Sequence, residues 1–293
     1  MKIAVYGPLY NERSKSTIKI LVAYLKNKNA NVFFEKNFYE SIISSSCIDL
    51  ISFGFKIFHV LDASYQLLIS IGGDGTILRA ITYVKDLNIP IVGINTGRLG
   101  FLSTIPMNEV EIALNEIFEG NYRVSKRSLL AINIGKSESE LDLNFALNEI
   151  SVSRKNTTSM ISIETWLDEE YLNSYWADGL IVSTPTGSTG YSLSCGGPVI
   201  MPESDSLVLT PIAPHNLNAR PIVISSEKVI KLKVTGREEK HLVSLDSRIK
   251  TLQNNTTITI TKAPFYIHMI ELKDEHFINT LRKKLLWGAD KRN

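Results

Sequence analysis

Cysteine is scarce in this sequence of 293 residues, and long apolar runs are missing from it. The two cysteines, Cys47 and Cys195, lie far apart without the spacing of metal ligands, which argues against a disulfide-stapled scaffold and against a cysteine-based zinc site. No apolar run approaches the roughly 18 residues of a membrane-spanning helix, and the first residues read as a strand rather than as a targeting segment. We therefore expect a cytoplasmic protein that does not act at a membrane.

An excess of charge is also missing. Thirty-two Lys and Arg residues stand against 30 Asp and Glu residues, and the formal net charge of +2 lacks the strong field of nucleic-acid-binding proteins. The local run Arg282-Lys283-Lys284 is interpreted as the solvated face of a last helix. With 44% hydrophobic residues, the chain can bury one large core or two ordinary ones. We expect a globular protein that acts on small molecules and has no nucleic-acid partner.

The first part of the sequence alternates strand-like and helix-like segments. Apolar runs typical of buried strands occupy residues 3–7, 31–34, 67–71 and 89–94, and helical spacing occupies residues 16–26, 77–84 and 108–118. Residues 35–58 indicate no definite element. The alternation favours a Rossmann-like, open parallel sheet that binds its ligand along the carboxyl ends of the strands.

The most informative loop of this part is Gly72-Gly73-Asp74-Gly75-Thr76, which follows the apolar run Leu67–Ile71. Glycines let the backbone approach a ligand closely, and amides at the start of the next helix favour an anion. A carboxylate among them would repel phosphate, so Asp74 is expected to act on a hydroxyl or to hold a metal. The plain alternative is a turn in which Asp74 caps the helix.

After about residue 120 the pattern changes to short, often alternating strand-like segments separated by polar turns. They lie at residues 122–124, 129–134, 150–152, 161–167, 229–234 and 257–260 and predict an all-β, β-sandwich-like domain. Apolar residues at three- and four-residue steps predict a closing helix over Asp274–Leu286 that returns to the first domain. The expected bounds are residues 1–122 for the α/β domain, 123–270 for the β domain and 271–293 for the closing helix.

Two stretches of the second part carry chemistry. Asn148 and Glu149 are adjacent polar residues at the start of an apolar strand, where they either cap local backbone or face a cleft. Asp178 opens a longer stretch, in which a buried strand empties into a loop rich in glycine and hydroxyls. Such a loop offers amides and hydroxyl donors to a charged or sugar-like ligand, and Tyr191 adds a ring on which a base could stack.

Together, the Gly-Gly-Asp-Gly-Thr loop, Asn95–Leu102, Asn148-Glu149 and residues 178–198 resemble the NAD kinase family over nearly the whole chain. The first loop is shared in form with lipid kinases and, more loosely, with phosphofructokinases, whereas the long stretch from Asp178 is more specific. The resemblance implies ATP-dependent phosphorylation of the 2'-hydroxyl of the adenosine ribose of NAD, which yields NADP. It places the reaction at a cleft between an α/β domain and a β domain.

The resemblance also implies roles for single residues. Asp74 would be the catalytic proton acceptor. Contacts to the substrates are implied for Gly73, Gly75, Thr76, Arg79, Asn95, Asn148, Glu149, Asp178, Thr186, Ser188, Thr189, Gly190, Tyr191, Ser192, Leu193 and Ser194. ATP and NAD would be the substrates, polyphosphate a further candidate donor, and Mg²⁺ or another divalent cation the cofactor, with no metal ligand identified. Exposed edges of the β domain favour a homo-oligomer, either a dimer or a tetramer.

The sequence departs from the family pattern at three places. Gly190 replaces the usual Ala, Asp246-Ser247-Arg248 replaces the common Asp-Gly-Gln, and Trp176 stands where some bacterial relatives carry Arg. The role of Arg248 and the selectivity between NAD and NADH therefore stay open. Two alternatives are a lipid or sphingoid-base kinase of the same broad fold, which would need a pocket for an acyl chain, and a non-catalytic NAD-binding protein.

Overall fold

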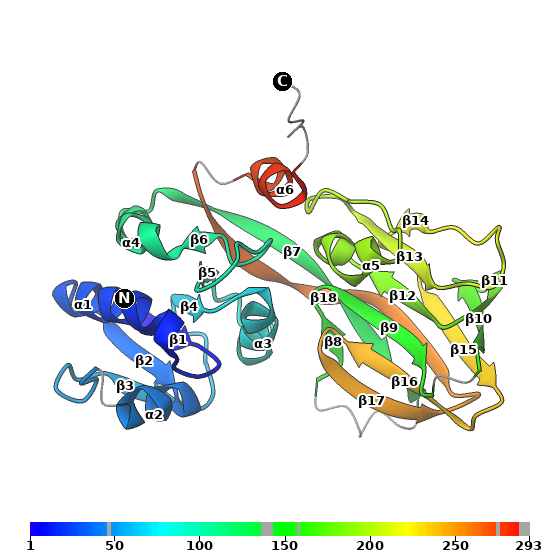
Figure 1. Ribbon diagram of the computed structural model, residues 1–293, viewed down its shortest axis with the longest axis horizontal. Coiled ribbons are helices and arrows are strands. Elements are labelled where there is room, and N and C mark those ends of the chain that lie inside the picture. The colour runs from blue at the N-terminus through cyan, green and yellow to red at the C-terminus, as the bar shows by residue number, and fades with distance from the viewer. Residues whose placement is uncertain (46–47, 136–142, 157–158, 274–275, 287–293) are drawn as a thin grey trace. The chain divides into compact units, whose positions relative to one another are not determined.

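The computed structural model describes residues 1–45, 48–135, 143–156, 159–273 and 276–286 (Figure 1). Cys47 and the predicted start of the closing helix at Asp274 lie outside these residues. The chain divides into two compact units, one formed by Met1–Lys126 with Ile267–Asn293 and the other by Arg127–Tyr266. Two long strands, β7 (Tyr122–Asn133) and β18 (Thr257–Leu272), run from one unit into the other.

The first unit is built on a parallel sheet with the strand order β3-β2-β1-β4-β5. Its strands are β1 (Lys2–Tyr6), β2 (Asn31–Glu35), β3 (Lys56–Phe58), β4 (Leu67–Ile71), β5 (Ile91–Asn95) and the short β6 (Ile105–Pro106), which pairs with β5. Its helices are α1 (Glu12–Asn27), α2 (Lys36–Ser44), α3 (Asp74–Val84), α4 (Val110–Phe118) and α6 (Phe277–Leu285), and a 3₁₀ turn covers Met107–Glu109. Because the order reverses between β1 and β4, the loops after these strands diverge and leave room for a ligand at their carboxyl ends.

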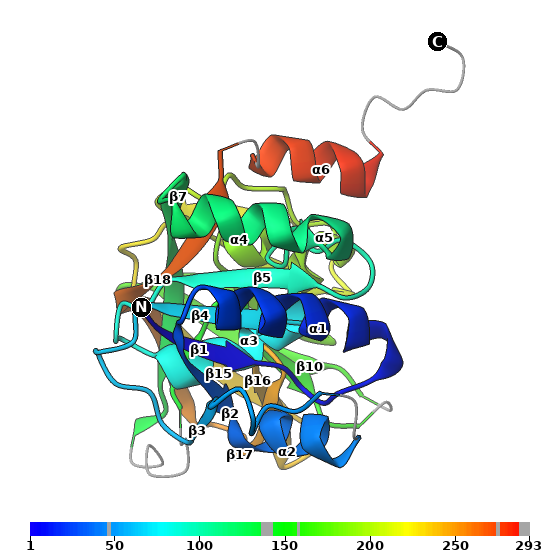
Figure 2. The same ribbon diagram turned by 90° about the vertical axis from the view of Figure 1, so that its left-hand side faces the viewer.

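Helices cover both faces of this sheet. Tyr24 of α1 donates a hydrogen bond of 2.7 Å to Asn115 of α4, so these two helices lie side by side (Figure 2). Helix α3 covers the opposite face, where Ile77 packs so closely on β5 that a Cβ at Gly93 would lie 2.5 Å from its Cδ1 atom. The predicted open α/β sheet is therefore present, with all residues of β4 and β5 buried.

Two helix starts differ from the sequence-based expectation. Helix α1 begins at Glu12 rather than near residue 16, because Asn11 and Ser14 form a reciprocal capping box. Helix α3 begins at Asp74 rather than at residue 77, so the carboxylate of the Gly-rich loop lies in the first helical turn. Helix α2, for which the sequence indicated no element, is capped by Glu35, which accepts the Phe38 N–H at 3.0 Å.

The second unit contains two antiparallel sheets. One has the order β14-β13-β12-β9-β16-β17, and in the other β11, β10, β15 and β18 are neighbours. The strands are β8 (Phe145–Ala146), β9 (Glu149–Arg154), β10 (Ile161–Leu167), β11 (Glu170–Ala177), β12 (Gly179–Ser183), β13 (Ser206–Ile212), β14 (Ile222–Ser225), β15 (Ile230–Gly236), β16 (Lys240–Leu245) and β17 (Arg248–Gln253). A 3₁₀ turn (Thr186–Thr189) and the short helix α5 (Tyr191–Ser194) follow β12.

The core of the second unit lies between its two sheets. Val152 of β9 and Leu180 of β12 share one apolar cluster with Ile163 of β10 and Leu232 of β15, so the inner faces of both sheets contribute to it. This is the predicted sandwich-like arrangement. Two strands are longer than expected: residues 122–133 form a single strand, and β18 runs on to Leu272.

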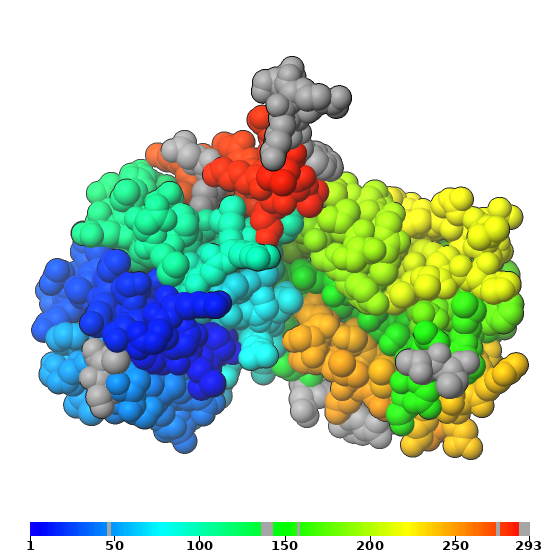
Figure 3. Space-filling view, viewed as in Figure 1, coloured from blue at the N-terminus to red at the C-terminus, as the bar shows by residue number. Residues whose placement is uncertain are grey.

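Helix α6 belongs to the first unit, as expected for the closing helix. Its residues are largely exposed except for the buried Leu281, and in the space-filling view its red surface is visible (Figure 3). Within the described residues, no helix combines the length and the apolar character needed to cross a membrane.

Candidate functional site

In the first unit, the Asp74 carboxylate holds the glycine-containing loop that follows β5. Its Oδ2 atom accepts the Phe101 N–H at 2.8 Å, and its Oδ1 atom accepts the N–H groups of Leu102 and Ser103 at 3.0 and 2.9 Å. The Ser103 hydroxyl then donates to the Gly72 carbonyl at 2.9 Å. The two Gly-rich loops predicted at neighbouring strand ends are therefore joined through one carboxylate.

Asn95 holds the same loop from its other end. Its amide nitrogen donates to the carbonyls of Arg98 and Ser103 at 2.7 and 3.3 Å, and its Oδ1 atom accepts the Gly97 N–H at 2.7 Å. The side chain is only 3% exposed. Both amide hydrogens are thus used inside the protein, and what the structure shows for Asn95 is support of the loop.

Helix α6 packs against this loop as well. The rings of Phe277 and Phe101 lie 6.2 Å apart between centroids, and the Lys284 ammonium donates to the Leu99 carbonyl and lies 5.7 Å from the Phe101 ring centroid. Arg282, Lys283 and Lys284 are all exposed on α6, in line with the interpretation of this run as a solvated face, and Lys284 in addition contacts the loop. A residue of the chain's last described segment supports the loop that surrounds Asp74.

Gly73 and Gly75 are exposed, and a Cβ at either position would meet no atom within 4 Å. The start of α3 is therefore open on the side of these glycines, where the helix dipole favours negative charge. Thr76 is buried beneath them, with 8% exposure.

Arg79 is exposed and lies five residues after Asp74, which on an α-helix amounts to about 140° around the axis. It lies beside Tyr6 at the end of β1. Burial, with Tyr83 and Glu35, raises the pKa of Tyr6 to about 12, and the positive charge of Arg79 opposes the rise. The structure thus separates Arg79 from the face of α3 that carries Asp74.

In the second unit, Asp246 binds the backbone of residues 147–149. Its carboxylate accepts the N–H groups of Leu147, Asn148 and Glu149 at 3.0, 2.8 and 3.2 Å. The Asp246 N–H in turn donates to the Glu149 carbonyl at 3.0 Å. Asp246 has a φ of +52°, a left-handed conformation that Asp adopts more readily than most residues.

The carbonyl groups of the same segment face the hydroxyl-rich loop. The Thr184 hydroxyl donates to the Leu147 carbonyl at 2.6 Å, and the Thr184 N–H donates to the Asn148 carbonyl at 2.9 Å. Residue 187 must be glycine, because a Cβ there would lie 2.1 Å from the Asn148 carbonyl oxygen. Every backbone N–H and C=O group of residues 147–149 is therefore hydrogen-bonded.

The backbone of residues 147–149 is fully hydrogen-bonded, but two of the side chains there have polar atoms without hydrogen-bond partners among the described residues. Within the part of the chain that the structure describes, Asn148 Oδ1 and Glu149 Oε2 are buried atoms with no hydrogen-bond partner. Burial, and then the neighbouring Asp246, raises the pKa of Glu149 to about 8, which favours the protonated carboxyl near neutral pH. Since unsatisfied buried polar atoms are costly, a polar partner for these two atoms would be energetically favourable.

Gly190 lies next to the side chains of Asn148 and Glu149. A Cβ at residue 190 would be 3.4 Å from Glu149 Oε2 and 3.2 Å from the Gly187 carbonyl oxygen. The first distance is an ordinary contact and the second is slightly tight, so glycine here leaves more room beside Glu149 than alanine would.

The hydroxyl-rich loop itself is largely buried. Ser188 donates to the Pro185 carbonyl at 2.6 Å and accepts the Ile200 N–H at 2.9 Å, and the hydroxyls of Ser192 and Thr210 lie 2.8 Å apart. Thr186 is 8% exposed, and Thr189, half-buried, donates to its carbonyl at 3.3 Å. These hydroxyls are hydrogen-bonded within the loop and hold its shape. At the start of α5, Tyr191 is 46% exposed. In the same helix Leu193 is half-buried and Ser194 is exposed.

Asp178 follows β11 and forms an ion pair with Arg154, with 2.9 Å between Oδ2 and the guanidinium. Both side chains are about one-quarter exposed, at 26% and 27%. Trp176, two residues earlier, is 52% exposed and stacks on His215 with 4.3 Å between ring centroids. Among the described residues, no group of three His, Cys, Asp or Glu side chains could hold a metal ion.

The sequence was compared with known proteins. Residues 9–122 match the ATP-NAD kinase N-terminal domain family, and residues 147–272 match the ATP-NAD kinase C-terminal domain family. NAD kinases of Christiangramia forsetii and Flavobacterium psychrophilum are 57% and 56% identical to it, each with 100% of both chains covered. The chain belongs to the NAD kinase family. The resemblance inferred from the sequence is confirmed, and the assignment favours an NAD kinase over a lipid kinase or a non-catalytic binding protein.

Solved structures show the same fold. A yeast NADH kinase complexed with NADH is 21% identical, with a TM-score of 0.86 over 99% of this chain and 89% of its own. An NAD kinase from Archaeoglobus fulgidus in complex with ATP is 28% identical, with a TM-score of 0.75 over 98% of this chain and 99% of its own. The predicted fold class, a parallel-sheet part and an antiparallel β part with a C-terminal helix, is confirmed.

Sequence reasoning missed several residues that build the site of this NAD kinase. Arg154 and Thr184 act through partners distant in sequence, and Asp246 was noted only as part of a motif with an open role. The signal that could have indicated Asp246 is its place in a two-residue turn between β16 and β17, where an Asp side chain readily accepts backbone N–H groups.

Proposed function

We propose that this NAD kinase transfers the terminal phosphoryl group of ATP to the 2'-hydroxyl of the adenosine ribose of NAD, with NADP as the product. The observation that carries the proposal is the identity of 57% with a full-length NAD kinase, together with an intact Asp74 at the open start of α3. Phosphoryl transfer requires alignment of a hydroxyl with a phosphate and neutralisation of charge, more than covalent participation of the protein.

In the first unit, Asp74 is the proposed acceptor of the hydroxyl proton. Three backbone N–H groups occupy three acceptor positions of its two oxygens, and a carboxylate offers about four. One position on Oδ2 is left for a substrate hydroxyl. The exposed glycines Gly73 and Gly75, with Thr76 beneath them, are the proposed groups for phosphate. Arg79, on another face of α3, is proposed to contact phosphate or ribose only at longer range.

In the second unit, Asn148 and Glu149 are the proposed polar contacts of the dinucleotide, because their Oδ1 and Oε2 atoms are buried without partners in the described structure. Asp178 and the exposed ring of Tyr191 are proposed to contact ribose or base groups of the same ligand. Gly190 gives the ligand room, while Thr186, Ser188, Thr189, Ser192, Leu193 and Ser194 form the wall around it. Asn95 is proposed to act only by supporting the loop over Asp74.

The divalent cation is proposed to arrive with ATP. The described residues form no cluster of three metal-ligating side chains, and Asp74 is already engaged by backbone N–H groups. Mg²⁺ commonly binds through substrate phosphates with few protein ligands, so a substrate-borne ion suits these residues better than a resident one. Its contribution is neutralisation of phosphate charge.

The assembly and cellular location follow as further proposals. Strands β14 and β17 are the edge strands of the six-stranded sheet, and Val223 on β14 is 50% exposed. Exposed edges of this kind are readily covered by another copy, which supports a homo-oligomer. A cytoplasmic location is proposed from the NAD kinase reaction, whose substrates are soluble small molecules. Light scattering on the purified protein would measure the oligomeric state.

The activity test uses the purified full chain with NAD, ATP and Mg²⁺, and detects NADP with an NADP-specific dehydrogenase. We expect NADP to form in proportion to enzyme and to depend on the divalent cation. Parallel reactions with NADH and with polyphosphate define the acceptor and donor ranges. If NAD binds and no NADP forms with either donor, the proposed reaction is wrong even though the fold is that of a kinase.

A further inference from the structure

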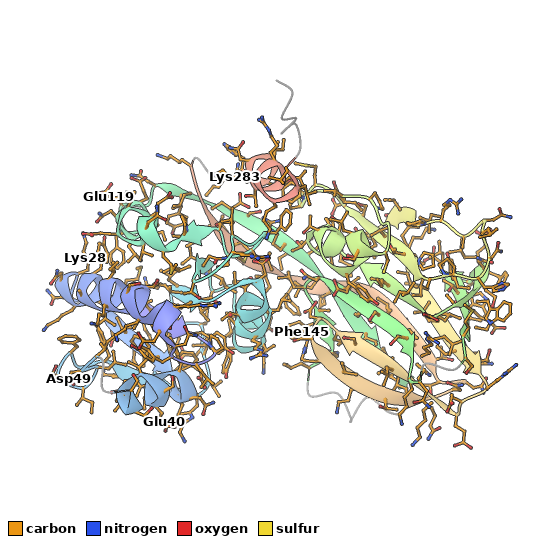
Figure 4. The ribbon with its side chains drawn as sticks, in the orientation of Figure 1. Lys28, Glu40, Asp49, Glu119, Phe145 and Lys283 are labelled. Carbon is orange, nitrogen blue, oxygen red and sulfur yellow. The ribbon has the colours of Figure 1, made fainter. Side chains whose placement is uncertain are left out.

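Two residues at the hairpin turn between β16 and β17 hydrogen-bond to the backbone of the segment that carries Asn148 and Glu149. Asp246, the first residue of the turn, accepts the N–H groups of residues 147–149. Arg248, the first residue of β17, donates to the Phe145 carbonyl and, at 3.4 Å, to the Leu143 carbonyl. Its guanidinium also lies 5.3 Å from the centroid of the ring of Phe145, the first residue of β8, which is labelled in Figure 4.

The two side chains carry opposite charges and complement the backbone groups they meet. An anion receives N–H groups and a cation meets carbonyls, so each bond is charge-assisted. Burial raises the pKa of Asp246, whereas its three N–H donors and the nearby Arg248 oppose the rise. Of the neighbouring carboxyl groups, Asp246 accepts three N–H groups and Glu149 Oε2 accepts none in the described structure, so Asp246 is the better placed of the two to carry a negative charge.

We propose that Asp246 is a positioning residue for dinucleotide binding: it fixes the backbone of residues 147–149, and its negative charge biases the Glu149 carboxyl toward donating a hydrogen bond instead of accepting one. The proposal rests on the proposed function, in which Glu149 contacts the dinucleotide. A dinucleotide is rich in acceptors, because its ribose rings, phosphates and carboxamide all carry oxygen lone pairs. A bound ligand also excludes water from Glu149, and this favours the neutral carboxyl further.

Among the described residues, Asp246 is the charged group that acts on the pKa of Glu149. Tyr191 lies near enough for its pKa to be raised by burial first, and then by Cys195, Asp178 and Glu149. The pKa of Cys195 is also raised by burial. Neither group supplies a positive charge to hold Glu149 ionised, and Arg248 is engaged with the carbonyls of β8 and its preceding residues.

The first measurement uses the unmodified protein and NAD as the probe. NAD affinity is measured by calorimetry at intervals between pH 6 and pH 9. We expect constant affinity up to about pH 8 and then a fall that approaches about tenfold per pH unit, because only the protonated carboxyl can donate. A flat curve, or an affinity that rises with pH, overturns the proposal.

The variant Glu149→Gln tests whether Glu149 is the titrating group. Its side-chain amide donates at every pH, so we expect NAD affinity close to the low-pH value of the unmodified protein. The fall in affinity that begins near pH 8, called the break below, should be absent. Retention of the break in this variant overturns the proposal, since another group would then be responsible. NADH as a second probe removes the positive charge of the nicotinamide ring, and we expect the same break with it.

The variant Asp246→Asn tests the positioning residue itself. Asn tolerates the left-handed φ of +52°, so the turn is not strained, but the negative charge and one N–H acceptor are lost. We expect weaker NAD binding and a break shifted to lower pH. If the amide prevents folding, Asp246→Ser replaces it, with the same expected shift.

Asp168→Asn is the matched control. Asp168 lies in the turn between β10 and β11 with a φ of +56°, accepts the Val229 N–H at 3.0 Å and forms an ion pair with Lys228 at 2.6 Å, so its described partners lie at residues 228 and 229 and not at residues 147–149. We expect its break to stay where the unmodified protein has it. A uniform loss of affinity in Asp246→Asn without a shifted break overturns the proposal in favour of a purely structural role. If the protein binds no NAD at all, the proposed function fails instead.

Discussion

A Cβ atom on Gly100 would lie 1.8 Å from Oδ1 of Asp74. The loop can present the N–H groups of Phe101, Leu102 and Ser103 to this carboxylate only because residue 100 has no side chain. Asp74 and Gly100 are thus a matched pair from two loops: the carboxylate fills the space that the glycine leaves.

Gly100→Ala should therefore displace either the loop or the Asp74 side chain. Misplacement of a catalytic group by about 1 Å can cost on the order of 10²-fold in rate, and we expect kcat to fall by about that factor. Gly97→Ala is the control, because a Cβ there would meet only Asn95 Oδ1, at 4.0 Å. Steady-state kinetics of both variants decide the matter, and equal activities would contradict the pairing of Asp74 with Gly100.

Asp74→Asn should lower kcat by about 10²- to 10⁴-fold while NAD binding stays largely intact, because an amide cannot take the proton. The amide also accepts fewer of the loop's N–H groups than the carboxylate does. A control variant is therefore needed that loosens the loop while Asp74 stays intact. Ser103→Ala serves this purpose, since it removes only the bond of 2.9 Å to the Gly72 carbonyl. We expect a small kcat effect for Ser103→Ala. A loss confined to KM in Asp74→Asn would identify Asp74 as a binding group.

Phe277→Ala on α6 should weaken the support of the loop around Asp74. The variant removes the ring that packs 6.2 Å from Phe101, and the same helix places Lys284 on the Leu99 carbonyl. We expect kcat to fall several-fold with little change in the melting temperature, because α6 is largely exposed and contributes few buried groups. Ile278→Ala, at a neighbouring position with 54% exposure, should behave like the unmodified enzyme. Equal kcat values for the two variants would rule out this support.

Glu149→Gln should change how stability depends on pH. Burial raises the pKa of Glu149 to about 8 in the folded state, above the usual value of 4.5. The folded state therefore binds more protons than the unfolded state between these two values, and stability falls as the pH rises through this window. Glutamine does not titrate. The difference in melting temperature between the variant and the unmodified protein should therefore be more favourable to the variant at pH 8.5 than at pH 5. A difference that does not depend on pH would show that Glu149 is ionised in the fold.

Tyr191→Ala should lose about tenfold in NAD affinity, which corresponds to about 1.4 kcal/mol, whereas Tyr191→Phe should bind nearly as well as the unmodified protein. The ring is 46% exposed, so neither variant should lose much melting temperature. Tyr171→Ala is the control for removing an exposed ring, since Tyr171 is 55% exposed on β11 and packs on Trp166. Normal affinity of Tyr191→Ala would remove the ring from the proposed site.

The parts of the fold that the sequence predicted are those with strong local signals. The apolar run Leu67–Ile71 is β4 to the residue, because a strand buried on both faces is a nearly continuous apolar run. Strand β7 was predicted as two pieces, since the polar residues 125–128 between them interrupt the apolar signal although they continue the strand. Local composition cannot show that a polar run is extended when long-range pairing determines it.

For the candidate site as well, the sequence indicated the residues with strong local signals and missed those that act over long sequence separations. Asp74 and Asn148-Glu149 stood out as polar residues in apolar or glycine-rich surroundings, and the structure places them at open or unsatisfied positions. The sequence left open whether Asn148-Glu149 caps backbone or faces a cleft. In the structure the backbone there is held by Asp246, whose carboxylate reaches Leu147 across 99 residues of sequence, a separation at which no local pattern operates.

The complete hydrogen bonding of the backbone at residues 147–149 has an evolutionary consequence. The shape of this segment is set by Asp246 and Thr184, and neither the Asn148 nor the Glu149 side chain takes part in it. Because these two side chains are proposed to contact the ligand, we expect single substitutions at positions 148 and 149 to alter ligand preference while the backbone that carries them stays folded. On this proposal, ligand preference can change in small steps through intermediates that still fold.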